Sequence, residues 1–186
     1  MKKTLFLISL LVFVISSASV FAAFGSLEGY VTDSVTGNGV YGAQVKVWLG
    51  GTDYVTTYSM AGGYFLFNND LPAGSGYQIF FSKANYNSLT LNCPEICSGC
   101  RKSLNAVLPA KDGTGVLEGH VTACDTGQPL ENVNIVASTY SMVTDSNGFY
   151  HIRLAKGNNH TLRATYSGYP RYDQSGITVP GSNNTQ

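Results

Sequence analysis

Apolar and polar residues alternate along most of this chain, and a period of two predicts β-strands with one buried face. The segment 43–49 shows the pattern most clearly. Its apolar residues, which we place on the core side, are Ala43, Val45, Val47 and Leu49. The residues between them, which point outward, are Gln44, Lys46 and Trp48. The matching core positions further along the chain are Val133, Ile135, Ala137 and Thr139.

Clusters of Gly, Asn, Asp and Pro separate the strand-like segments, as turns do in an all-β protein. In the first half of the chain we predict strands at 27–33, 43–49, 54–58, 64–68, 77–83, 88–91 and 103–108. In the second half we predict strands at 117–123, 133–139, 141–144, 149–154, 160–166 and 176–179. Seven short strands in one unit are typical of a β-sandwich.

An internal repeat sets the domain organisation. Residues 25–40 (GSLEGYVTDSVTGNGV) return as residues 115–130 (GVLEGHVTACDTGQPL), and half of the paired positions are identical. The spacing is too long for a solenoid unit and suits a small β domain. We therefore predict two tandem Greek-key-type sandwiches, residues 23–109 and 116–186, joined by a linker at 110–115.

The second copy has no segment that corresponds to the predicted strand 103–108. A sandwich without its seventh strand leaves backbone groups of the neighbouring strand unpaired, which sheets normally avoid. Two explanations stay open at this point. Either the polypeptide continues beyond Gln186 into the missing strand and further domains, or a partner donates the strand.

Residues 1–22 have the pattern of a secretory signal peptide. Two lysines precede an apolar run, and Val20-Phe21-Ala22 resembles a signal cleavage site. We therefore expect a secreted or cell-surface protein without a membrane span after cleavage. Eleven basic side chains balance eleven acidic ones, so the composition gives no reason to expect a nucleic-acid partner.

Four motifs of the second unit resemble the carboxypeptidase regulatory-like domain. They are LEGHVT at 117–122, TGQPLENV at 126–133, TDSNGFY at 144–150 and YSGY at 166–169. The first unit departs from the third motif, with SMAGG at 59–63. The resemblance covers the predicted mature chain apart from an insertion at 92–102. It implies two copies of a transthyretin-like, seven-stranded sandwich that serve as accessory modules without catalytic residues.

The four cysteines offer three kinds of chemistry. Cys93, Cys97 and Cys100 have the C-x3-C-x2-C spacing of some iron–sulfur sites, but a loop of a small exported sandwich is the wrong context for that motif. With Cys124 they could form a four-cysteine zinc site. In an oxidising compartment they would instead form two disulfides, one of them between the units. The sequence leaves the pairing open.

No enzyme class or cofactor is indicated. His120, His151 and His160 are far apart, no His-x-x-Glu metal pair exists, and no serine lies in a Gly-x-Ser-x-Gly motif. Asn159 and Asn183 begin glycosylation sequons.

The sequence therefore predicts a non-catalytic exported module pair that acts as a spacer, an adhesion element or an accessory region, with a cell-surface protein or a polysaccharide as partner. The alternative is carbohydrate binding by exposed aromatic residues of the first unit. The candidate ligand-binding residues are Trp48, Tyr54, Tyr58 and Gln44. Packing of Trp48 under a loop or between the domains is the competing explanation for this residue.

Overall fold

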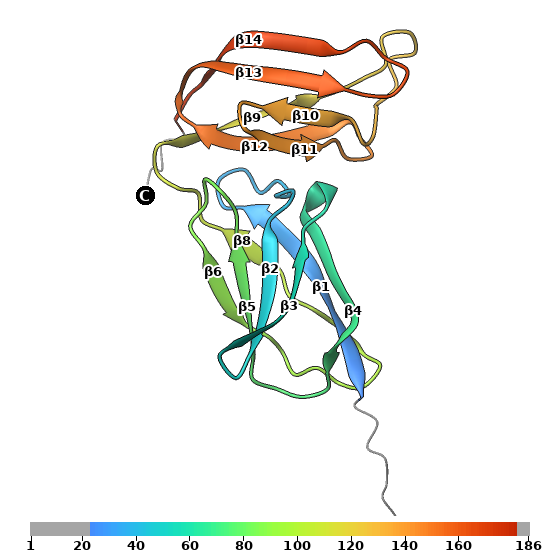
Figure 1. Ribbon diagram of the computed structural model, residues 1–186, viewed down its shortest axis with the longest axis vertical. Helices are drawn as coiled ribbons and strands as arrows, with labels where there is room; N and C mark the ends of the chain where they lie inside the picture. The colour runs from blue at the N-terminus through green and yellow to red at the C-terminus, as the bar shows by residue number, and fades with distance from the viewer. Residues whose placement is uncertain (1–22, 182–186) are drawn as a thin grey trace, which may run out of the picture.

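The computed structural model describes residues 23–181 and contains two all-β domains in series (Figure 1). The predicted all-β fold is confirmed. The predicted signal peptide at 1–22 and the sequon at Asn183 lie outside the described residues. Within residues 23–181, no helix is long and apolar enough to cross a membrane.

The first domain is a sandwich of two sheets that contain eight strands. The strands are β1 Phe24–Asp33, β2 Gln44–Leu49, β3 Thr52–Tyr58, β4 Tyr64–Pro72, β5 Tyr77–Ser82, β6 Leu89–Asn92, β7 Arg101–Ser103 and β8 Ala106–Leu108. One sheet has the order β4-β1-β7, with β8 also paired to β1, and the other has the order β3-β2-β5-β6. A short 3-10 turn, η1 (Ala61–Gly63), precedes β4.

The alternation of β2 places its residues as predicted. Ala43, Val45 and Val47 are fully buried, and Leu49 packs partly buried against the same core. Phe65 and Phe67 of β4 and Phe81 of β5 make the largest contribution to this core, with Phe65 edge-on to both other rings. Burial of such side chains is the dominant stabilising term, on the order of 1.5–3 kcal/mol for each.

The predicted strand at 103–108 consists of two short strands in the structure. β7 pairs with Ser26–Glu28 and β8 with Val31–Asp33 of β1, both in parallel. Between the two strands, the Asn105 side chain accepts a hydrogen bond from the Tyr30 backbone N–H at 3.0 Å. The Asn105 side chain thus takes the place of a backbone carbonyl in the pairing with β1, which explains why β7 and β8 are two strands and not one.

The second domain repeats this plan with fewer strands. It contains β9 Thr114–His120, β10 Asn134–Ala137, β11 Tyr140–Val143, β12 Phe149–Ala155, β13 Gly157–Thr165 and β14 Tyr172–Val179. One sheet has the order β11-β10-β13-β14, and β9 pairs with β12 in the other. Val133, Ile135 and Ala137 are buried as predicted. Thr139 is exposed, which corrects its predicted core position, because β10 ends before a turn in which Ser138 has φ +54°.

β9 is shifted relative to the predicted strand 117–123. It begins at Thr114, inside the predicted linker, and ends at His120. The equivalent strand β1 continues to Asp33 because β8 pairs with its last three residues. Among the described residues, no strand pairs with 121–123 in this way, so regular β structure stops earlier.

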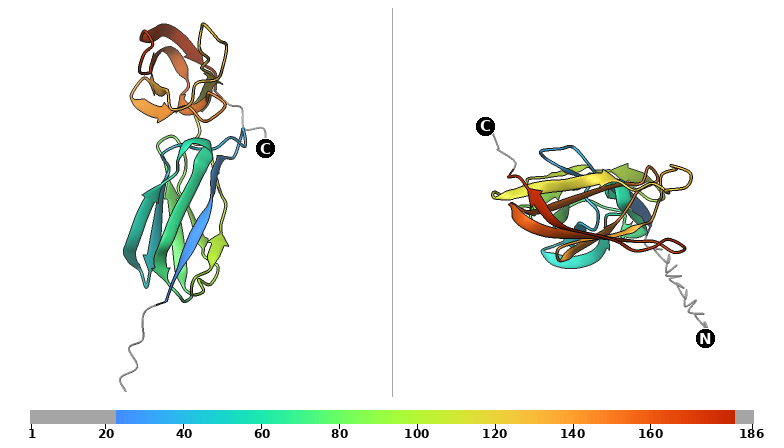
Figure 2. Two further views of the ribbon diagram at one scale, coloured as in Figure 1. Left: turned by 90° about the vertical axis from the view of Figure 1, so that its right-hand side faces the viewer. Right: turned by 90° about the horizontal axis from the view of Figure 1, so that it is seen from above.

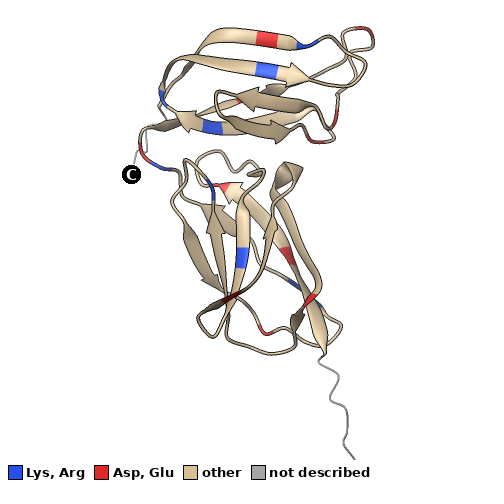
Figure 3. Ribbon diagram, viewed as in Figure 1, with Lys and Arg blue, Asp and Glu red and all other residues tan. Residues whose placement is uncertain are grey.

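The second domain sits across one end of the first (Figures 1 and 2). Its strands run across the long axis of the first domain, and the sheet of β9 and β12 faces that domain's end loops. Acidic and basic residues are sparse and dispersed over both domains (Figure 3).

Candidate functional site

The outer face of the sheet β3-β2-β5-β6 collects the predicted ligand-binding residues, and we call it the aromatic face. Strand register places Gln44 opposite Tyr58 and Lys46 opposite Thr56, and neighbouring β5 contributes Phe80. Tyr58 is 57% exposed. The face consists of Gln44, Lys46, Trp48, Tyr54, Thr56, Tyr58, Gln78 and Phe80.

Trp48 lies flat on Phe80, with ring centroids 5.4 Å apart and an interplanar angle of 6°. Trp48 is half-buried, and its Nε1 atom is covered without a hydrogen-bond partner. The indole lies near enough to Asp53 to contribute to the lowered pKa of that carboxyl, a shift that the hydrogen bond from Lys46 dominates. Trp48 thus forms part of the floor of the aromatic face, packed within its own sheet rather than between the domains.

Tyr54 and Gln44 occupy the margins of the same face. A register shift between Val47 and Trp48 puts Tyr54 at a bulge, where it is 44% exposed. Burial raises the pKa of Tyr77, and the nearby Tyr54 adds to this rise. Gln44 Nε2 donates to Tyr58 Oη at 3.4 Å, a long hydrogen bond. The structure therefore brings Gln44 and Tyr58 together, while Trp48 lies four residues further along β2 and Tyr54 lies at the bulge.

A second feature, the domain junction, contains an ion pair that the sequence analysis did not predict. Arg153 of β12 donates from Nε to Asp33 Oδ2 at 2.8 Å and from Nη2 to Asp33 Oδ1 at 2.9 Å. Both side chains are fully buried. This two-point contact between a planar guanidinium and a carboxylate fixes direction as well as distance.

Other donors also converge on Asp33. Tyr86 Oη donates to Oδ2 at 2.8 Å, and the Val35 backbone N–H donates to Oδ1 at 2.8 Å. Burial alone would raise the pKa of Asp33, but the hydrogen bonds from His151, Val35, Tyr86 and Arg153 outweigh it and hold the pKa well below its ordinary value of 3.8. Asp33 is therefore a carboxylate at neutral pH.

His151 extends the contact toward the edge of the junction. Its Nε2 lies 3.3 Å from Asp33 Oδ2, and its Nδ1 lies 3.3 Å from Glu118 Oε2. Glu118 also accepts a hydrogen bond from Asn38 Nδ2 of the first domain at 3.1 Å. A chain of polar contacts thus runs from the exposed Glu118 to the buried Asp33.

Backbone and apolar contacts complete the junction. Asn85 Nδ2 donates to the Arg153 carbonyl at 2.8 Å, and the Arg153 guanidinium lies 5.4 Å from the centre of the Tyr86 ring. Tyr41 of the first domain packs against the core of the second. The cavity left between the domains has a volume of about 20 Å³, room for about one water molecule. The two domains are therefore closely packed.

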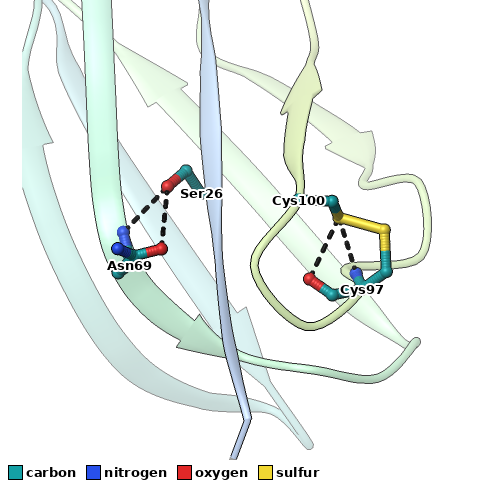
Figure 4. Close-up of a disulfide and its surroundings, with 4 residues drawn as sticks. All are labelled: Ser26, Asn69, Cys97 and Cys100. Atoms are coloured by element: carbon teal, nitrogen blue, oxygen red, sulfur yellow. Dashed lines mark hydrogen bonds between the residues drawn. A yellow bond between two sulfur atoms is a disulfide. The ribbon is translucent and has the colours of Figure 1, made fainter.

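The cysteines do not form the predicted bridge between the units. Cys97 and Cys100 form a disulfide within one loop, and Cys93 and Cys124 are free thiols. Figure 4 shows this loop beside β1, where Ser26 Oγ accepts a hydrogen bond from the Asn69 backbone N–H at 2.9 Å. Among residues 23–181, no group of three or more His, Cys, Asp or Glu side chains is arranged to hold a metal.

The predicted glycosylation site and the other two histidines lie apart from the aromatic face and the domain junction. Asn159 is exposed on β13 with φ +67°. His120 and His160 make separate local contacts, with the Asn147 carbonyl and with Ser138 Oγ. The sequence did contain a signal for the junction. Asp33 stands where the second copy has Ala123, so a charged residue replaces an apolar one within the repeat.

The family comparison agrees with the motifs of the second domain. Residues 116–186 match the family model described as carboxypeptidase regulatory-like domain. The second domain is therefore similar to the carboxypeptidase regulatory-like domains. The match does not include the first domain, so a second copy of this family stays a prediction from the repeat. A comparison with curated proteins found no match.

Several solved structures are similar to the chain at low sequence identity. The Bacillus anthracis TIE protein is 19% identical with a TM-score of 0.41, over 86% of this chain and 32% of that one. A candidate carbohydrate-binding protein from Bacteroides uniformis is 16% identical with a TM-score of 0.40, and the match covers 81% of this chain and 98% of that one. A double mutant of the shaft pilin SpaA from Lactobacillus rhamnosus GG is 12% identical with a TM-score of 0.35, and the match covers 86% of this chain and 97% of that one. The chain thus spans about a third of the TIE protein's length.

Proposed function

We propose that this chain is a non-catalytic module of an exported protein in which the two domains form one rigid spacer. The observation that carries the proposal is the buried contact between Arg153 and Asp33, which belong to different domains. Domains joined by a short linker usually move relative to one another. Here, any other closed arrangement would leave a buried charge without its partner, at a cost of several kcal/mol.

The rigid arrangement suits a spacer or adhesion element, because it fixes the distance and direction between the two ends of the module. Nuclear relaxation of backbone amides tests this directly. We expect both domains to have the same rotational correlation time, that of one elongated body. Clearly different correlation times for residues of β2 and residues of β13 would contradict the proposal.

Carbohydrate binding by the aromatic face is a second candidate function. The stacked pair Trp48 and Phe80 gives a flat apolar floor, and Tyr58 and Gln44 add polar groups on the same side. Aromatic rings that expose one face suit the apolar faces of sugar rings, while hydroxyl and amide groups bind sugar hydroxyls.

Affinity electrophoresis in gels that contain soluble β-glucan, xylan or mannan tests this candidate. Tyr58→Ala should weaken retardation by about tenfold, about 1.4 kcal/mol of binding free energy, without loss of folding because Tyr58 is exposed. Tyr172→Ala is the matched control, since Tyr172 is 55% exposed in the second domain. Equal retardation of the two variants, or none for the parent chain, would reject the aromatic face as a binding site for these polysaccharides.

A further inference from the structure

The loop between β6 and β7 contains a disulfide that neither candidate function uses. It joins Cys97, which is exposed, to Cys100, which is half-buried. The loop is hydrogen-bonded to Phe24, the first residue of β1, whereas the last residue of β1, Asp33, contacts the second domain. The disulfide therefore lies at the end of the first domain remote from the junction (Figure 1), with Cys97 accessible from outside.

The stability of the fold gives only a weak reason for this disulfide. A disulfide stabilises a protein mainly by restricting the unfolded chain, and this effect grows with the length of the loop that it closes. Only Ser98 and Gly99 lie between the two cysteines. A ring this small restricts the unfolded chain very little.

Backbone hydrogen bonds hold the same turn without help from the sulfur atoms. The Cys100 N–H donates to the Cys97 carbonyl at 3.2 Å, and Gly99 takes the positive φ that the turn needs, +67°. The Gly99 N–H donates to the Phe24 carbonyl at 2.7 Å, and the Ser26 N–H donates to the Cys100 carbonyl at 2.8 Å. The two cysteines therefore stay close together when the bridge opens.

The Cys100 sulfur already has a partner for each form that it takes after reduction. The Cys97 N–H donates to Cys100 Sγ at 3.0 Å, and the same sulfur lies 3.0 Å from the Cys97 carbonyl oxygen (Figure 4). A disulfide sulfur carries no hydrogen to donate to that carbonyl, whereas a Cys100 thiol does. A Cys100 thiolate would accept the Cys97 N–H as a charge-assisted hydrogen bond. The loop is thus arranged to stabilise Cys100 as a leaving group.

We propose that the Cys97–Cys100 disulfide is a thiol–disulfide exchange site, and that its ligand is a compound with a free thiol. The thiolate of this compound attacks Cys97 Sγ, and the bond to Cys100 breaks as the new disulfide at Cys97 forms. The electron pair leaves with Cys100, whose thiolate accepts the Cys97 N–H. Attack of Cys100 on Cys97 Sγ reverses the step and releases the thiol, so the cycle consumes no oxidant or reductant. The proposal is independent of the rigid junction and of the aromatic face.

The two free thiols of the chain determine the design of the experiment. Burial raises the pKa of Cys93 to about 11, so at neutral pH this residue is not the thiolate that exchange requires. Cys124 is exposed in the second domain and could attack the disulfide of another molecule. A Cys124→Ser background removes that reaction.

Isotope-labelled reduced glutathione is the probe, added without oxygen so that only disulfides can react. The reaction is stopped with acid, free thiols are blocked with N-ethylmaleimide, and the adduct is located by peptide mapping. We expect the adduct at Cys97, formed about tenfold faster than exchange with glutathione disulfide under the same conditions, because Cys100 is a stabilised leaving group. An adduct mainly at Cys100, or a rate no higher than that of glutathione disulfide, would overturn the proposal.

A short peptide with a single cysteine distinguishes the two sources of a thiol. A higher rate with this peptide than with glutathione would assign the site to a polypeptide partner, and the reverse order would assign it to a small thiol. Either order supports exchange at Cys97, whereas no reaction with both thiols would overturn it.

Variants separate exchange from a purely structural role. The double variant Cys97→Ser with Cys100→Ser should form no adduct and keep nearly the melting temperature of the parent chain, because the backbone contacts of the loop and the buried Ile96 remain. Ser98→Ala, at an exposed position of the same turn, is the matched control and should react at the parent rate. A large fall in melting temperature of the double variant would contradict the proposal, since the loop would then depend on the bridge that exchange must open.

Discussion

Replacing Arg153 with methionine should release the two domains from their fixed arrangement. Methionine keeps most of the volume of the side chain but removes the positive charge beside Asp33. The carboxylate would keep hydrogen bonds from Tyr86 and from the Val35 backbone N–H. Removing one member of a buried pair costs about 3–5 kcal/mol, and these remaining donors favour the lower end, about 3 kcal/mol.

The penalty applies only while the junction is closed, because opening it hydrates Asp33. A cost of about 3 kcal/mol changes the ratio of closed to open molecules by more than a hundredfold. We therefore expect Arg153→Met to make the domains tumble separately, with each domain still folded. Small-angle scattering and backbone amide relaxation measure this change.

Two controls separate the charge from other effects. Arg163→Met removes an ion pair with Asp173 that is about half exposed, so it should change stability by less than about 1 kcal/mol and leave the shape unchanged. The double variant Asp33→Leu with Arg153→Met removes both charges and should restore much of the closed form. If Arg153→Met alone keeps the shape and stability of the parent chain, the ion pair does not hold the junction.

Because the pKa of Asp33 is lowered on folding, its contribution to stability is complete above about pH 3.8 and declines as the pH falls further; scattering during an acid titration should show the junction intact at pH 5 and opening only in stronger acid. Burial raises the pKa of Cys93 to about 11, so iodoacetamide at pH 8 should modify the exposed Cys124 well before Cys93 in a mass-spectrometric time course, and equal rates would contradict this. Gly29→Ala should destabilise the first domain by about 1–3 kcal/mol in urea unfolding, since its methyl group meets the Leu104 backbone, whereas Gly119→Ala should cost clearly less.

The repeat and the alternation of apolar residues were sufficient to predict two sandwiches and much of both cores. Val45 and Val47, and their counterparts Ile135 and Ala137, are buried as expected, because the period of two is set by local backbone geometry. Strand ends were harder to predict. β9 ends at His120 because no described strand pairs with the residues after it. Local alternation of apolar and polar residues does not reveal which distant segments pair.

The junction was missed for a related reason. Asp33 and Arg153 are distant in sequence, and each looks like an ordinary surface residue of its own strand. Their burial results from the way the two domains pack together. Only the departure from the repeat, aspartate in one copy and Ala123 in the other, marked the position as unusual.

Two positions of the repeat show how the copies relate to their surroundings. Asp33 departs from the repeat where the first domain receives Arg153 of the second. Gly29 and Gly119, in contrast, are the same residue, although only Gly29 has a backbone passing over it. At Gly119 the neighbour is the Tyr150 ring of the paired strand β12, whose hydroxyl a Cβ atom would meet at 2.8 Å. The same residue type thus makes room for a backbone in the first domain and for an aromatic ring in the second.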